Sequence, residues 1–180
     1  MKVYPDAPPT IRAILQLGEM QFGARDFLVF EEERGTFTAF ARAGEHFANI
    51  LVETYGVKKG DRVAVIMRNY PQWPVPFFAA LCIGAIATPM NSWWTGDELE
   101  YGLKDSGAKV AVMDPQLLDR LRDHLGNLTE LEAIIIARGG ASETDPKITA
   151  MDDLIGPANS WADLAQIGLP EVDLDTDDDA

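Results

Sequence analysis

The side chains best suited to catalysis in this sequence are two histidines and one cysteine. His46 and His124 lie far apart in the chain, and Cys82 sits inside an apolar run. A nucleophile needs a base within hydrogen-bond reach, and a structural metal site needs ligands at short, regular spacings. The spacing of these three residues indicates neither a nucleophile with its base nor a metal site. We therefore expect His46 to be solvated, His124 to cap the end of a helix and Cys82 to be a small core residue.

Acidic pairs and glycine-rich stretches add no stronger candidate. Asp152 with Asp153, and the acidic residues 31–33, are typical of turns and surfaces. The sequence contains neither G-x-x-x-x-G-K-[ST] nor a G-x-G-x-x-G between a strand and a helix. "RGG" at residues 138–140 follows an expected strand and is interpreted as a loop rather than a phosphate site. The residues alone predict no catalytic, cofactor-binding or metal-binding position.

Composition narrows the class of protein. The 180 residues carry 15 basic and 29 acidic side chains, a formal net charge of −14, so the field would repel a phosphate backbone. Nucleic acid is therefore not an expected partner. A single cysteine and the absence of a signal-peptide pattern predict a cytoplasmic protein. The most apolar segment, residues 75–90, contains prolines and a glycine and is shorter than the about 20 residues of a spanning helix, so no membrane span is expected.

The elements that would position any site alternate between strand and helix. Apolar runs and turn residues predict strands at 28–30, 35–37, 62–67, 85–88, 109–113 and 132–137, and helices at about 40–55, 75–84, 96–105, 115–125, 149–155 and 160–167. Strands alternating with helices imply right-handed crossovers. The predicted class is α/β, a mainly parallel sheet with helices on both faces. Residues 1–170 are interpreted as one unit, and the acidic residues 171–180 as a disordered tail or linker.

Two adjacent tryptophans precede one of these helices. With Thr95 as N-cap, Glu98 completes a capping box, and Trp94 and Leu99 occupy the positions of a hydrophobic staple. This local role accounts for Trp94 without a ligand. Trp93 has no such role and is either a core anchor or the wall of a groove, with the core anchor favoured.

Three stretches resemble a known family: "GTFTAF", "GVKKGDRVAVIMRNYPQW" and "AALCIGAIATPMNSWWTGDELEYGLKDSGAKVAVMD". From about Phe27 to Ala137 their succession is similar to the N-terminal subdomain of AMP-forming acyl-CoA synthetases, in the adenylate-forming superfamily. The most specific parts are "KKGDRVAV", "L-x-x-G-A-x-x-x-P-x-N" at residues 81–91 and "DSGAKV" at 105–110. The family's first core motif maps onto residues 36–40, where Ala39 replaces a glutamate, so Thr36 or Thr38 would cap the helix alone.

The resemblance implies an activity. Members of this family activate a carboxylic acid with ATP and Mg²⁺ as an acyl-adenylate, and then transfer the acyl group to coenzyme A. A fatty or related carboxylic acid would be the substrate. The family's phosphate loop with its lysine, and its ribose, metal and C-terminal lysine positions, match no residue here. The resemblance therefore implies a supporting subdomain that carries no catalytic position, binds none of these cofactors and is inactive alone.

Two other hypotheses assign the chain to different functional classes. The chain could be a non-catalytic interaction module that docks or self-associates through Trp93 or through uncovered sheet surface. It could also be an α/β domain that binds a small ligand at the carboxyl ends of its strands, which the architecture permits but does not assign.

Overall fold

The chain folds into a parallel sheet with helices on both faces and a small hairpin at one end. The structure, a computed structural model, describes residues 8–139 and 145–179. Its strands are β1 Asp26–Phe30, β2 Glu33–Thr36, β3 Arg62–Ile66, β4 Ile86–Pro89, β5 Ala108–Met113, β6 Ala133–Ile136 and β7 Ile148–Ala150. Its α-helices are α1 Ile11–Phe22, α2 Phe37–Glu53, α3 Pro74–Cys82, α4 Gly96–Ser106, α5 Pro115–Leu121 and α6 Met151–Ile155, with 3₁₀ helices η1 Arg122–Asn127 and η2 Ala158–Asp163.

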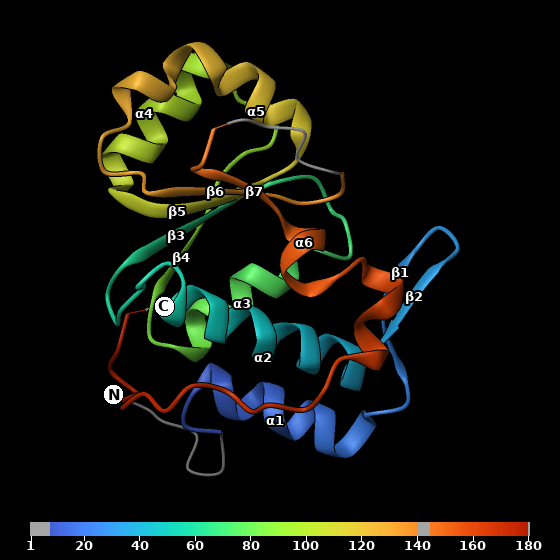
Figure 1. Cartoon of the computed structure of the whole chain (residues 1–180). Coiled ribbons are helices and arrows are strands. Elements are labelled where there is room, and N and C mark those ends of the chain that lie inside the picture. Colours follow the sequence, from blue (N-terminus) through green and yellow to red (C-terminus); the bar gives the residue numbers. More distant parts are fainter. Residues whose placement is uncertain (1–7, 140–144, 180) are drawn as a thin grey trace.

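The main sheet has the strand order β4-β3-β5-β6-β7, and every neighbouring pair in it is parallel. The strands β1 and β2 form a separate antiparallel hairpin. Helices α4 and α5 cover one face of the sheet, and α2, α3 and α6 lie on the other (Figure 1). The predicted α/β class with a parallel sheet between helices is confirmed.

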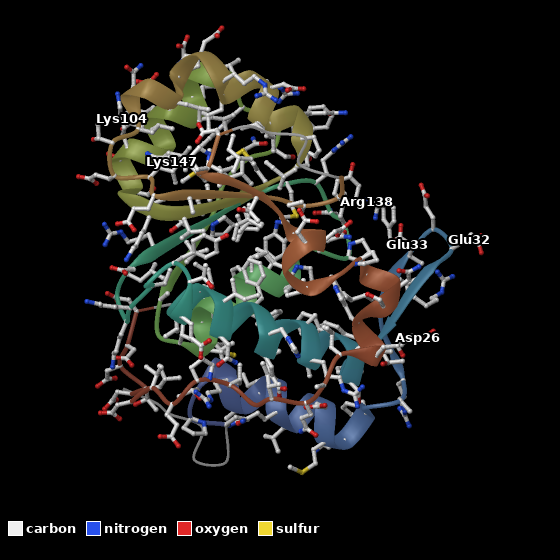
Figure 2. The ribbon with its side chains drawn as sticks, viewed as in Figure 1. Asp26, Glu32, Glu33, Lys104, Arg138 and Lys147 are labelled. Atoms are coloured by element: carbon white, nitrogen blue, oxygen red, sulfur yellow. The ribbon has the colours of Figure 1, made fainter. Side chains whose placement is uncertain are left out.

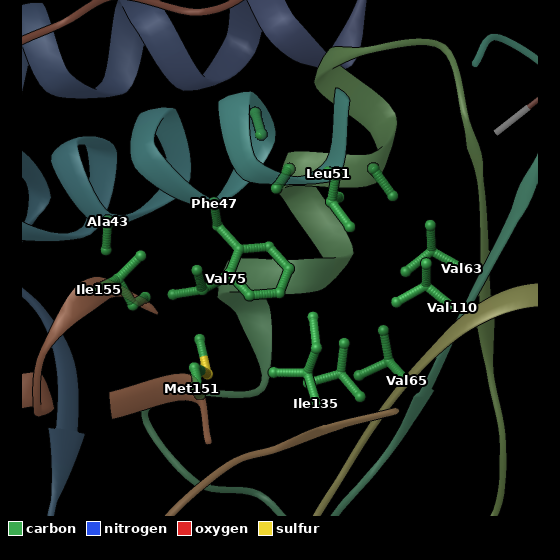
Figure 3. Close-up of a cluster of buried hydrophobic side chains, with 14 of the residues drawn as sticks. Ala43, Phe47, Leu51, Val63, Val65, Val75, Val110, Ile135, Met151 and Ile155 are labelled. Carbon is green, nitrogen blue, oxygen red and sulfur yellow. The ribbon is translucent and has the colours of Figure 1, made fainter. Parts of the chain in front are cut away.

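Alternate side chains of the central strands fill the two faces. On β3, Val63 and Val65 join the core under α2, whereas Ala64 and Ile66 join the core under α4 and α5. Figure 3 shows the first of these cores, in which Phe47 of α2 lies among side chains of the sheet and of α6. Because both faces are covered, the strands are apolar runs without alternating polar positions.

The start of α4 follows the sequence prediction. The Thr95 hydroxyl accepts the Glu98 N–H at 3.4 Å, and a Glu98 carboxylate oxygen accepts the Thr95 N–H at 2.8 Å, so the capping box is confirmed. Trp94 packs, partly buried, against the core that contains Leu99. Trp93 is 78% exposed, so its interpretation as a core anchor was wrong.

Four elements differ from the prediction, and one of them, the helix expected at 160–167, is the 3₁₀ helix η2 Ala158–Asp163. Helix α1 was not predicted, although Thr10 caps it by accepting the Ala13 N–H at 3.2 Å. The helix expected at 149–155 begins only at Met151, as α6, and the residues before it form the three-residue strand β7. The helix expected at 115–125 ends at Leu121 and continues as η1. The three residues of β7 are too few to show a period.

Candidate functional site at the carboxyl edge of the sheet

The strand order places a topological switch point between β3 and β5. Helix α3 follows β3 on one face of the sheet, and α5 follows β5 on the other (Figure 1). In open α/β sheets, ligands bind outside the carboxyl ends of the strands where the crossovers diverge in this way. The side chains that follow β3, β5 and β6 are therefore the candidates for a site.

An ion pair crosses the switch point. Asp114, which follows β5, is 2% exposed, and its carboxylate lies 3.4 Å from the Nε of Arg68, which follows β3. The same carboxylate oxygen accepts the Arg68 backbone N–H at 3.4 Å, and the other accepts the Leu117 N–H as the N-cap of α5. Asp114 thus joins β3 to the start of α5, which is a structural role for a buried carboxylate.

A second arginine ties the hairpin to this edge. Arg138 follows β6 and donates two parallel hydrogen bonds to Glu33 of β2, at 3.1 and 2.8 Å. This bidentate pairing with Glu33 raises the pKa of the Arg138 guanidinium. Figure 2 shows Arg138 and Glu33 side by side where the hairpin meets the sheet. Arg138 has a φ of 57°, a left-handed conformation uncommon for a residue with a side chain.

Aromatic rings connect the two arginines. The ring of Tyr70 lies 5.1 Å from the Arg68 guanidinium and 4.9 Å from that of Arg138. Phe30 of the hairpin lies 5.2 Å from Arg138 and packs edge-on against Tyr70. Cation–π contacts of this geometry are worth about 0.5–1 kcal/mol at exposed sites. The edge is therefore a preassembled arrangement of two paired arginines and two rings.

A hollow of about 280 Å³ adjoins this arrangement. It lies between the hairpin residues 27–30 and the segment 69–74, with Asn69, Tyr70 and Trp73 among its lining residues. Gln72, in the same segment, is 4% exposed, and its side-chain oxygen has no hydrogen-bond partner among the described residues. A buried acceptor without a partner is rare and marks a place where a water or ligand donor is expected. Sequence reasoning missed Gln72, since only burial in the folded chain distinguishes it.

The amino-acid sequence also matches a known protein family. The sequence profile of the AMP-binding enzymes matches residues 18–174. The chain belongs to the AMP-binding enzyme family. This result confirms the resemblance found in the sequence.

Its relatives in the AMP-binding family include CoA ligases. The long-chain-fatty-acid–CoA ligase of Salmonella typhimurium is 28% identical over 154 residues, which cover 86% of this chain and 27% of that ligase. The 4-coumarate–CoA ligase 2 of Oryza sativa subsp. japonica is 33% identical over 129 residues, covering 68% of this chain and 22% of the relative. The chain thus spans about a quarter of the length of these curated relatives.

Solved structures of the AMP-binding family share the fold. The anthranilate CoA ligase AuaEII, determined in complex with anthranoyl-AMP, superposes with a TM-score of 0.78 at 25% identity, over 88% of this chain and 30% of that one. The N-terminal domain of FACL13 from Mycobacterium tuberculosis superposes with a TM-score of 0.68 over 94% of this chain. At 23% identity this second likeness shows the fold alone.

The AMP-binding family implies a nucleotide with its metal ion, and the carboxyl edge is where such a group would bind. Two carboxylates at the carboxyl edge, Asp114 and Glu33, are already paired with arginines, and a third, Asp152 just after β7, lies near Arg138. Within residues 8–139 and 145–179, no group of three or more His, Cys, Asp or Glu side chains could hold a metal ion. The described donor set at this edge therefore does not fit Mg²⁺, and we derive no chemical step from it.

The histidines and cysteine singled out in the sequence lie elsewhere. His46 hydrogen-bonds the carbonyl of Ala165 at 2.9 Å, rather than being only solvated. His124 lies in η1, and its Nδ1 is 2.6 Å from a carboxylate oxygen of Glu100 on α4. That contact joins two helices, which is a different role from the expected helix cap. Cys82 is a buried core residue as predicted, and burial raises the pKa of its thiol to about 12.

The acidic pairs have different surroundings. Residues 31 and 32 form the hairpin turn, whereas Glu33 begins β2 and binds Arg138. Burial is the largest cause that raises the pKa of Asp152, and the charge of Asp153 raises it further. The charge of nearby Arg138 lowers it. Of "RGG", Gly140 is outside the described residues. No helix in the described part of the chain is long and apolar enough to cross a bilayer.

Proposed function

We propose that this chain is the N-terminal subdomain, residues 1–170, of an ATP-dependent acyl-CoA ligase acting on a fatty or related carboxylic acid. The observation that carries the proposal is the family match over residues 18–174, together with a fold shared with CoA ligases. In the proposed reaction the substrate carboxylate bonds to the α-phosphorus of ATP and releases pyrophosphate, and the thiol of coenzyme A then displaces AMP to give the thioester.

The proposed role of these 180 residues is structural. The pair of exposed Arg68 with buried Asp114 and the bidentate pair of Arg138 and Glu33 hold β3, β5, β6 and the hairpin in fixed relative positions. Catalysis depends on positioning within fractions of an ångström, so a rigid edge is suited to support reacting groups supplied by residues outside this chain. The chain by itself is proposed to be inactive, with no catalytic, cofactor-binding or metal-binding residue of its own.

The experiment that tests this proposal is exchange of labelled pyrophosphate into ATP by the purified 180-residue chain. We expect no exchange that depends on an added carboxylic acid, with octanoate, palmitate and anthranilate as the acids tried. A full-length CoA ligase assayed in parallel is the positive control. Carboxylate-dependent exchange that survives further purification would show that the chain has its own adenylation site and overturn the structural role.

A separate experiment addresses the ligase assignment. The coding DNA is read past the Ala180 codon, and any longer product is assayed for acyl-CoA formation. The proposal expects a continuing frame with a Ser/Thr/Gly-rich loop and a lysine. A longer product that forms no acyl-CoA from any acid in a broad panel would contradict it.

A second candidate function is a non-catalytic interaction module. The observation that favours it is the exposure of two large side chains in one segment, Trp93 at 78% and Tyr101 at 68%. Large exposed aromatic side chains are enriched at protein interfaces. Sedimentation of the wild-type chain and of Trp93→Ala tests it, with self-association that the substitution abolishes as the supporting result. A wild-type chain that stays monomeric at all concentrations counts against self-association.

A further inference from the structure

Helix α1 encloses a cavity that the ligase proposal does not use. It packs on α2 and α3 rather than on the sheet, and none of its described residues is buried (Figure 1). The cavity has a volume of about 210 Å³ and lies between these three helices. Leu169 borders it as well, in the C-terminal segment that Arg12 holds against α1 by hydrogen bonds to the carbonyls of Leu169 and Pro170.

The cavity wall is mainly aromatic and aliphatic. Five phenylalanines line it: Phe22, Phe27, Phe37, Phe40 and Phe78. Cys82 is a further lining residue, and a thiol whose pKa burial raises to about 12 is uncharged at neutral pH. Lining residues of this kind exclude water and favour an apolar occupant. For scale, a dry apolar cavity of about 150 Å³ in another protein binds benzene.

One glycine keeps this space open at a cost to its helix. Gly44 lies in the interior of α2, where glycine is about 1 kcal/mol less favourable than alanine. A Cβ atom built at Gly44 would meet no other atom within 4 Å, so close packing does not require glycine there. The missing side chain instead leaves room in the cavity that Gly44 lines.

The charged groups that line the cavity are both carboxylates. Glu19 of α1 and Glu45 of α2 lie on its wall. Desolvation raises the pKa of Glu19 most, and the charge of Glu45 raises it further. The charge of Arg42 lowers it. Glu45 is held in place by the N–H groups of Ile167 and Gly168, at 3.2 and 3.1 Å. Arg42 does not line the cavity and donates to the carbonyl of Ala162. The nearby cations Arg12, Arg25 and Arg42 lie outside the lining. An anionic head placed beside Glu19 and Glu45 would therefore be repelled by these two carboxylates, whereas a neutral or cationic head would not.

We propose that this cavity binds a small amphiphile of about ten non-hydrogen atoms, with an alkyl or aromatic body and a neutral or cationic head. The body lies among the phenylalanine rings, and the head faces Glu19 and Glu45. The occupant differs in charge from the carboxylic acid of the proposed reaction, and its site is formed by α1, α2 and α3 rather than by the paired arginines of the carboxyl edge.

The test uses three probes that share one alkyl chain and differ only in the head: octylamine, 1-octanol and octanoate. Binding to the full 180-residue chain is followed by thermal unfolding and by NMR. We expect saturable binding of octylamine and octanol, with nuclear Overhauser contacts from the alkyl chain to Phe40 and Phe78. Octanoate should bind at least about tenfold more weakly than octanol, a difference of about 1.4 kcal/mol.

Two leucine substitutions locate the site. Gly44→Leu fills the cavity and should weaken octanol binding by about tenfold or more. Gly126→Leu is the matched control, because a Cβ at Gly126 in η1 also meets nothing within 4 Å. It should leave octanol binding unchanged. Glu19→Gln should bring the dissociation constants of octanoate and octanol closer together.

Several results would overturn the proposal. These are no saturable octanol binding by the wild-type chain, equal weakening by both leucine variants, or octanoate binding as tightly as octanol. If Gly44→Leu does not fold, the wild-type NMR contacts decide alone. Alkyl contacts to residues outside the α1, α2 and α3 lining then count against the site.

Discussion

The two helical faces of the sheet are packed in different ways. On one face, α4 and α5 lie directly on the strands, and Leu99, Leu103, Leu117 and Leu121 are each at most 2% exposed. On the other face α2 and α3 take that place and α1 forms an additional layer, with a cavity of about 210 Å³ beneath it. A helix that packs only on other helices can leave space that a helix against the sheet cannot, because the strands offer a continuous apolar surface.

The largest expected effect is the loss of stability when one leucine side chain is truncated on each face. Leu99→Ala removes a fully buried side chain of α4 and should lower the free energy of unfolding by about 2–5 kcal/mol. Leu15→Ala on half-buried α1 should cost about 1 kcal/mol or less, because Leu15 already borders the cavity. Urea unfolding of both variants measures the difference. Equal losses would mean that α1 is as tightly packed as α4.

Replacing a helix glycine with alanine should change stability in opposite directions on the two faces. Gly102→Ala in α4 places a Cβ atom 2.6 Å from the Trp94 ring, and this overpacking, at about 1–3 kcal/mol, should outweigh the gain in helix propensity. Gly44→Ala in α2 meets open space and should stabilise the chain by about 1 kcal/mol. Thermal unfolding of the two variants should shift the midpoint in opposite directions. Destabilisation by Gly44→Ala would show that the cavity is not open at that position.

Helix caps distinguish global from local stability. Thr95→Ala removes the capping box of α4 and should lower the global free energy of unfolding by about 1 kcal/mol. Thr10→Ala removes the corresponding cap of α1, and we expect it to increase amide hydrogen exchange mainly within α1. Exchange measured by NMR for both variants tests this. Uniformly faster exchange after Thr10→Ala would contradict the separate layer.

The smallest effect is a dependence on pH at the α4 face. Hydrogen bonds from Lys104 first, then from His124 and Asn127, lower the pKa of Glu100 to about 2 from its ordinary value of 4.5. A carboxyl with a lowered pKa in the folded state contributes stability above its unfolded value, and that contribution is lost as the pH falls from about 4.5 towards about 2. Glu100→Gln should flatten the acid side of the stability profile. An unchanged profile would show that these hydrogen bonds contribute no net stability.

Much of the fold could be predicted because its signals are local. The apolar runs of β3, β5 and β6 are strands buried on both faces, and they lie within two residues of their predicted bounds. The capping box of Thr95 and Glu98 also depends on residues three positions apart. Helix α1 had a local signal too, since Thr10 follows two prolines and caps a run with apolar residues at helical spacing.

The candidate site was far less predictable. Arg138 and Glu33 are 105 positions apart, and nothing in either neighbourhood indicates the other. Gln72 differs from an exposed glutamine only by its burial. That its side-chain oxygen lacks a hydrogen-bond partner among the described residues can therefore be seen only in the folded chain.

The sequence by itself determined the α/β class, the alternation of strands and helices from β3 to β6, and membership of a family, because apolar periodicity, caps and motifs are written in consecutive residues. Only the tertiary structure decided which charged groups pair at the carboxyl edge, where Trp93 lies, and that α1 leaves a cavity over α2 and α3. The physical reason is that each of these depends on contacts between segments distant in sequence, whose energies are set by packing and burial.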